Sequence, residues 1–147
     1  MKKAALLLAL GFFAVSAQAQ CSLTSVRDAT ISEAFTKHGG WTFQNFEQVC
    51  QKLNRARARM QINAMATVLV NQSIGWAALT VVDRDTNIAT SSFNSMNTQV
   101  STYASQDKAD ELMVLAINEA ANNWSGLDRA LADLEAERKK ARSALAR

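Results

Sequence analysis

Two cysteines, Cys21 and Cys50, have the most specific chemistry in this 147-residue chain. An even number of cysteines in an exported chain predicts a disulfide, because compartments outside the cytoplasm are oxidising. Lipid attachment would require an aliphatic residue three positions before Cys21 and a small residue just before it, but these positions hold Gln18 and Gln20. We therefore predict a Cys21–Cys50 disulfide, and two separate buried thiols are the alternative.

Other side chains suited to metal binding or catalysis are sparse. His38 is the only histidine, so the chain lacks the ligands of a structural zinc site once its cysteines are paired. Residues 83–87 begin like a calcium loop, but Ile88 and Asn94 occupy the places of its glycine and glutamate, and a turn is the simpler interpretation. We predict no metal, no cofactor, no catalytic residue and no enzymatic activity. A hydrolase built on His38 is an alternative.

A group of basic residues could bind an acidic partner. Lys52, Arg55 and Arg59 are spaced to share one face of a helix, with Arg57 to the side. No aromatic residue is interleaved for base stacking, so we expect no nucleic-acid partner. We predict that this strip binds a partner, and pairing with acids of the C-terminal helix is the alternative.

Three tryptophans are candidates for ligand contact. Trp41 lies between two glycines and the cap of a predicted helix, where its ring could line the rim of a small-ligand pocket. Trp76 and Trp124 lie in periodic apolar runs, and we interpret both as core residues.

The first nineteen residues match the pattern of a signal peptide. Lys2 and Lys3 precede an apolar run over 4–15, and small residues at Ala17 and Ala19 form a cleavage site. The run is shorter than the ~20 residues of a membrane-spanning helix, so we expect no stable membrane anchor. The sequence predicts a signal peptide over 1–19, one domain over 20–147, and a periplasmic or secreted location.

The predicted mature chain is close to neutral and of single-domain size. Loss of Lys2 and Lys3 leaves 14 basic residues against 13 acidic ones. Net charge therefore gives no support for binding to nucleic acid or to an anionic membrane.

Hydrophobic periodicity predicts an α+β fold. Helices over 23–38 and from about residue 43 to 53 would form an N-terminal hairpin joined by the disulfide. Strands over 60–70, 74–82 and 88–96 would form a three-stranded antiparallel meander. Because 60–102 contains only three charged residues, one sheet face is expected to be neutral and hydrogen-bonding.

The C-terminal third carries a longer apolar seam. Its members, spaced by four and three, are Met113, Ile117, Ala120, Trp124, Leu127, Leu131, Leu134, Arg138, Ala141 and Leu145. The unbroken phase favours one long helix over 106–146, bent near Gly126, and two helices with a break are the alternative. We expect the extension over 127–147 to fold back or to project, and Leu127, Leu131 and Leu134 to bind a partner.

These features predict a small exported protein that acts by binding another envelope protein or a second copy of itself. An inhibitor, an immunity protein or an accessory component of a secretion or conjugation system would fit. A periplasmic small-ligand-binding module with Trp41 at its pocket is the alternative function.

Overall fold

A four-stranded sheet with helices on one side organises the chain. The computed structural model describes residues 21–146, so the predicted signal peptide lies outside the described residues. In chain order the elements are β1 (Ser25–Val26), α1 (Ala29–Lys37), α2 (Phe46–Arg55), β2 (Ala58–Leu69), β3 (Gln72–Asp83), β4 (Ser95–Ser101), α3 (Gln106–Asn122) and α4 (Leu127–Leu145). The α+β class is confirmed.

The sheet has the strand order β1-β2-β3-β4. The antiparallel pairs β2–β3 and β3–β4 confirm the predicted meander. β1 was not predicted, and it pairs in parallel with β2 through Ser25↔Met60 and Val26↔Gln61. A strand of two residues is too short to show a period of two, so the sequence could not reveal it.

The third predicted strand was placed too early in the sequence. Residues 88–94 form a loop, and the strand that follows is β4. Asn87 and Phe93 adopt φ values of 61° and 58°, which an extended strand cannot contain. The loop keeps one bridge to the sheet, between Ala89 and Val82.

The first helix begins later than predicted. Asp28 caps α1, and its side-chain oxygen accepts a hydrogen bond of 2.8 Å from the backbone N–H of Ile31. The residues before this cap are extended and supply β1.

The two N-terminal helices are present, but they do not pack as a hairpin. Gly39 and Gly40 follow α1 with φ values of 91° and 67°, and they redirect the chain. As a result α1 packs against α3, while α2 packs against β2.

The C-terminal seam is divided between two helices, so the favoured prediction of one long helix was wrong and the alternative of two helices with a break is confirmed. Trp124 lies in the break between α3 and α4 and is 7% exposed. Its indole Nε1 donates a 2.8 Å hydrogen bond to the carbonyl oxygen of Phe93. Periodicity continued through the break because both helices bury apolar residues in the same core, although the chain changes direction between them.

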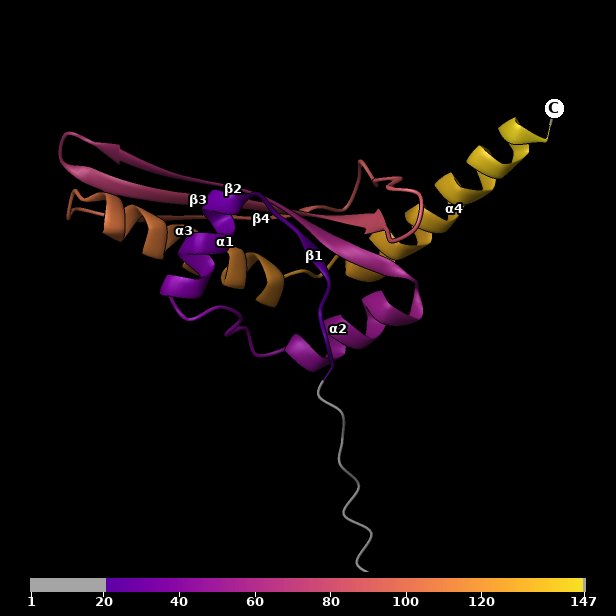
Figure 1. Ribbon diagram of the computed structural model, residues 1–147, viewed down its shortest axis with the longest axis horizontal. Coiled ribbons are helices and arrows are strands. Elements are labelled where there is room, and N and C mark those ends of the chain that lie inside the picture. Colours follow the sequence, from indigo (N-terminus) through magenta and orange to yellow (C-terminus); the bar gives the residue numbers. More distant parts are fainter. Residues whose placement is uncertain (1–20, 147) are drawn as a thin grey trace, which may run out of the picture.

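Helices α1, α2 and α3 lie along one side of the sheet, and α4 extends away from its end (Figure 1). Close packing of α3 on β3 depends on Gly75, because a Cβ there would lie 2.1 Å from the backbone of Leu112 and Met113. Within 21–146, no helix is long and apolar enough to cross a membrane.

Candidate interaction surface

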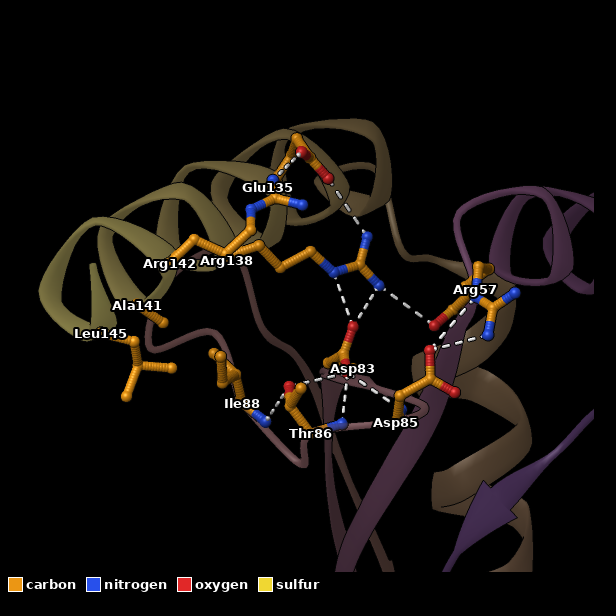
Figure 2. Close-up of a pocket in the computed structure, with 10 residues that line it drawn as sticks. All are labelled: Arg57, Asp83, Asp85, Thr86, Ile88, Glu135, Arg138, Ala141, Arg142 and Leu145. Carbon is orange, nitrogen blue, oxygen red and sulfur yellow. Dashed lines mark hydrogen bonds and ion pairs between the residues drawn. The ribbon is translucent and has the colours of Figure 1, made fainter.

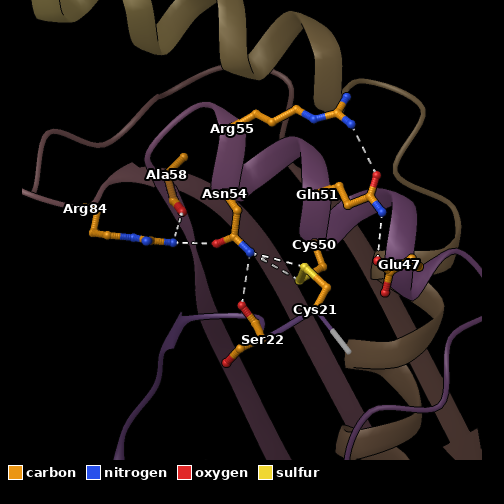
Figure 3. The surroundings of a disulfide bond; sticks show 9 residues. All are labelled: Cys21, Ser22, Glu47, Cys50, Gln51, Asn54, Arg55, Ala58 and Arg84. Atoms are coloured by element: carbon orange, nitrogen blue, oxygen red, sulfur yellow. Dashed lines mark hydrogen bonds between the residues drawn. A yellow bond between two sulfur atoms is a disulfide. The ribbon is translucent and has the colours of Figure 1, made fainter. Parts of the chain in front are cut away.

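The predicted disulfide between Cys21 and Cys50 is confirmed. It joins the segment before β1 to the middle of α2, with the two Cα atoms 6.1 Å apart. The Asn54 side chain lies beside it, and its Nδ2 is 3.2 Å from the Cys21 sulfur and 3.2 Å from the Ser22 carbonyl oxygen (Figure 3). The crosslink therefore holds the chain entering β1 against α2.

The basic residues of the predicted strip do not share one helix face. Lys52 and Arg55 belong to α2, whereas Arg59 lies in β2. The helix ends at Arg55 because Arg57 adopts a φ of 50°, which turns the chain into the strand. The prediction of a continuous strip was therefore wrong.

All four of these basic side chains have partners within the chain. Lys52 is 2.7 Å from Asp128 of α4, Arg57 is 2.9 Å from Asp85, and Arg59 hydrogen-bonds Asn87. Arg55 donates to Gln51 at 3.4 Å. The pairing of Lys52 with α4 matches the alternative considered from the sequence, namely pairing with acids of the C-terminal helix.

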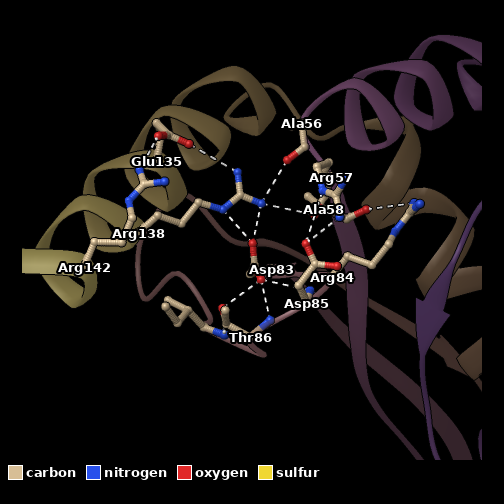
Figure 4. Close-up of polar contacts among 11 residues, drawn as sticks. Ala56, Arg57, Ala58, Asp83, Arg84, Asp85, Thr86, Glu135, Arg138 and Arg142 are labelled. Atoms are coloured by element: carbon tan, nitrogen blue, oxygen red, sulfur yellow. Dashed lines mark hydrogen bonds and ion pairs between the residues drawn. The ribbon is translucent and has the colours of Figure 1, made fainter. Parts of the chain in front are cut away.

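The turn after β3 is joined to α4 by a buried ion pair (Figure 4). Nε and Nη2 of Arg138 lie 2.6 and 2.5 Å from Oδ2 of Asp83. Nη2 also donates to the carbonyl oxygens of Ala56 and Arg57, at 2.9 and 3.1 Å. Arg138 thus connects three segments that are far apart in the sequence.

Asp83 remains ionised despite its burial. Burial alone would raise the pKa of its carboxyl group, but hydrogen bonds from Thr86, Arg138 and the amide of Asp85 hold the pKa well below its usual range. The other carboxylate oxygen accepts the Thr86 hydroxyl at 2.7 Å and the Asp85 amide at 2.9 Å. The residues that resemble a calcium loop therefore form a turn stabilised by its own donors.

A pocket of about 390 Å³ lies between this turn and α4 (Figure 2). Its charged residues largely pair with one another, since Glu135 binds Arg138 at 3.3 Å and Arg142 at 3.2 Å. The apolar part of its lining is Ile88, Ala141 and Leu145. Each guanidinium group of the lining thus has an acidic partner, namely Asp85 for Arg57, Asp83 for Arg138 and Glu135 for Arg142.

The leucines predicted to bind a partner contact the protein's own core. Leu127 and Leu134 are buried, and Leu131 is half-buried against the same core. They are therefore not available to a partner while the core is intact. Arg138, one turn further, still contacts Asp83, and residues 142–146 at the end of the helix, including Leu145, are exposed.

Trp41 also packs within the chain rather than at the pocket. Its ring centroid lies 4.7 Å from that of Phe35 and 5.5 Å from that of Phe43, both in edge-to-face geometry.

His38 lies at the C-terminus of α1, where its Nε2 is 3.6 Å from Oδ1 of Asp107. Among residues 21–146 no three His, Cys, Asp or Glu side chains are grouped so that they could hold a metal ion.

The sheet face opposite the helices carries apolar side chains. The register places in neighbouring rows Met65, Trp76 and Thr98, then Thr67, Ile74 and Val100, and then Asn63, Ala78 and Met96. Met65, Met96 and Val100 are 58%, 66% and 57% exposed. We call this surface, formed by these nine residues, the open face.

The prediction of a neutral and hydrogen-bonding face was correct about charge but missed the apolar centre. Trp76, which we interpreted as core, lies at the middle of the open face and is half-buried among its neighbours. A signal was present in β3, where apolar residues occupy both alternating positions between Ile74 and Val82. An apolar residue in a strand does not show which face will be covered.

The comparisons with known proteins identify no relative that informs function. No family model matches the sequence, and no curated protein matches it. Among solved structures, the chain is similar to a protein from Caulobacter crescentus CB15 described as a candidate lipoprotein. That similarity has 10% identity and a TM-score of 0.33, over 62% of this chain and 86% of the other. Nothing about function follows from a similarity this low.

Proposed function

We propose that this chain is an exported protein of the bacterial envelope that has no catalytic activity and acts by binding another protein through the open face. The signal-peptide pattern over 1–19 and the Cys21–Cys50 disulfide support export to an oxidising compartment. An inhibitor, an immunity protein or an accessory component of a secretion or conjugation system would act through a surface of this kind.

The observation that carries the proposal is the cluster of exposed apolar side chains on a sheet face that no helix of residues 21–146 covers. Complete burial of one methionine or valine side chain is worth roughly 1.5–3 kcal/mol, so Met65, Met96 and Val100 leave substantial free energy unused in water. A contiguous apolar patch of this kind marks an interaction site more often than isolated exposed residues do.

Charge indicates what kind of partner fits. None of the nine residues of the open face is charged, so an acidic polymer or an anionic membrane would find no cation there. An apolar protein surface with few charges could cover Trp76 and the methionines without burying an unpaired charge.

The test is site-specific photo-crosslinking in the periplasm of the encoding bacterium. A benzophenone amino acid replaces Met65 on β2, and a matched probe replaces Thr36, an exposed residue of α1 on the helical side. We expect one discrete adduct to a second envelope protein from position 65 and none from position 36. The same adducts from both positions, or none from position 65, would contradict the proposal.

A quantitative check uses the partner identified by that adduct. Met65→Gln keeps the side-chain length but removes apolar character, so the dissociation constant should rise about tenfold, which corresponds to ~1.4 kcal/mol. Thr36→Gln is the control and should leave the affinity unchanged. Equal affinity of the Met65→Gln variant would show that the open face is not the binding surface.

The small-ligand alternative receives no comparable support. It depended on Trp41 lining a pocket, and Trp41 instead packs against Phe35 and Phe43. The 390 Å³ pocket lies next to α4 and does not include this ring.

A further inference from the structure

Strand β4 forms one edge of the sheet. It pairs with β3 on one side and, within residues 21–146, with no strand on the other. Every second residue of an edge strand directs its backbone N–H and C=O outward, where they can pair with a strand from another chain.

This edge lacks the devices that usually prevent such pairing. Protein edge strands are commonly protected by charged residues, proline or a β-bulge. The sequence of β4, SMNTQVS, contains neither a charged residue nor proline. Its pairing with β3 proceeds without interruption from Ser73↔Ser101 to Leu79↔Ser95, so no bulge twists the edge away. The opposite edge differs, because β1 occupies the start of β2 there.

The composition of β4 suits pairing with an identical strand. Antiparallel pairing of two copies about a two-fold axis through Thr98 would set Met96 of each copy opposite Val100 of the other. Met96 and Val100 are more than half exposed, and each would gain an apolar neighbour. On the other side of the strand, Asn97 would face Gln99, and no two charges would meet.

We propose that two copies of this chain pair through the outer edge of β4, antiparallel and centred on Thr98, to form one continuous eight-stranded sheet. The two open faces then join into a single surface. The pairing uses backbone groups of the edge and does not depend on the partner proposed for the open face.

Disulfide trapping of the mature chain tests the geometry directly. Residues directly opposite in an antiparallel pair have Cα atoms about 4.5–5.5 Å apart, a separation that a disulfide can span. Thr98→Cys should therefore crosslink to its own copy in the purified protein under mild oxidation, giving a covalent dimer on a non-reducing gel. Peptide mapping should show a disulfide that joins position 98 of one copy to position 98 of the other, with the Cys21–Cys50 bond intact.

The matched control is Thr67→Cys, which lies on the same face in the part of β2 that β1 does not cover. It should run as a monomer on the same gel, because no covalent crosslink forms between the two copies. Crosslinking at 67 instead of 98 would overturn the proposal by placing the contact at β2.

A charge at the axis provides a second test that does not require an added thiol. Thr98→Lys would set two ammonium groups against each other, so the mass measured by sedimentation equilibrium should fall from that of a dimer to that of a monomer. Thr67→Lys should remain dimeric, and circular dichroism should show that both variants are folded. A wild-type protein that stays monomeric at about 100 µM, or a Thr98→Lys variant that stays dimeric, would overturn the proposal.

Met65 lies on β2, two strands away from Thr98 in the same row, and takes no part in the proposed edge pairing. The two proposals can therefore fail separately. Loss of the dimer with retention of the Met65 adduct would remove only the edge pairing. Retention of the dimer without an adduct would remove only the proposed function.

Discussion

Asp83 and Arg138 show how single side chains fix the arrangement of the elements around them. The side chains of Asp83 and Arg138 are only 5% and 17% exposed. Arg138 neutralises the carboxylate and also satisfies two backbone carbonyl groups at the end of α2. Breaking a buried pair of this kind by removing one partner typically costs about 3–5 kcal/mol, because the other charge is left without compensation.

The Asp83 pair makes stability depend on pH in a defined direction. The pKa of Asp83 is lowered in the folded protein, so its contribution is complete above the unfolded value of about 4 and is lost as the pH falls towards the folded value. We expect the free energy of unfolding, measured in urea, to fall as the pH is lowered from 5 to 2.5.

The matched control for this prediction is Asp83→Asn. It should have a lower free energy of unfolding than the wild type at pH 7. This difference in free energy should narrow below pH 4, because Asp83 then becomes protonated in the wild type while the other carboxylates titrate alike in both proteins. A difference that stays constant from pH 7 to 2.5 would show that Asp83 does not contribute through its charge.

At this scale the sequence could assign residues to local structure but not to distant partners. It identified Asp83 as part of a turn, and the turn is present. The pairing with Arg138 lies 55 residues away, and nothing in local spacing indicates it. The same applies to Thr42, whose amide donates to Asn118 at 2.7 Å.

Elements follow periodicity wherever they are long enough to display it. Strands β2 and β3 and helix α2 were predicted because an alternating or a helical pattern persists over 10 residues or more. β1 was missed because of its length, and the break at Trp124 was judged wrongly because the seam continues in phase. A seam in phase shows which residues are buried, but not whether the backbone between them is straight.

The contact between β3 and α3 depends on the absence of a side chain at Gly75. A Cβ at this position would overlap the Leu112 backbone at 2.1 Å, and backbone cannot move aside as a side chain can. Gly75→Ala should lower the free energy of unfolding by about 3 kcal/mol or more, measured by urea denaturation.

Gly126→Ala is the graded control for that substitution. A Cβ there would lie 3.2 Å from Cβ of Phe93, which requires a shift of only a few tenths of an ångström. Its effect should stay within about 1 kcal/mol. Equal effects of the two substitutions would contradict the close approach of α3 to β3.

For the whole molecule, the disulfide secures the N-terminal edge of the sheet. The segment after Cys21 reaches the sheet through the Thr24 carbonyl oxygen, which accepts the Met60 amide at 3.2 Å. β1 contributes only two residue pairs of its own, so its attachment depends strongly on the crosslink to α2.

Removal of the disulfide should therefore destabilise the protein and loosen this edge. The double variant Cys21→Ser/Cys50→Ser should lose about 3–4 kcal/mol of unfolding free energy. In the chain-entropy model this is the effect of no longer restricting the unfolded chain by a crosslink between residues 29 positions apart. Hydrogen exchange at the Met60 amide should accelerate, while exchange within the β2–β3 hairpin should change only with global stability.

The reduced wild-type protein is the control, and it should match the double variant in both measurements. Unchanged exchange at Met60 after reduction would show that β1 holds its place without the disulfide.

The short separation between the two cysteines bears on the order in which an exported chain would acquire its structure. In a chain that crosses a membrane from its N-terminus, residues 21–50 arrive before any of the long hairpin has emerged. The crosslink can then close first, whereas contacts such as Thr42–Asn118 must wait for residues 76 positions further along. Formation of the disulfide is thus expected to be an early step of maturation. The sheet would then assemble next to a β1 segment that is already crosslinked to α2.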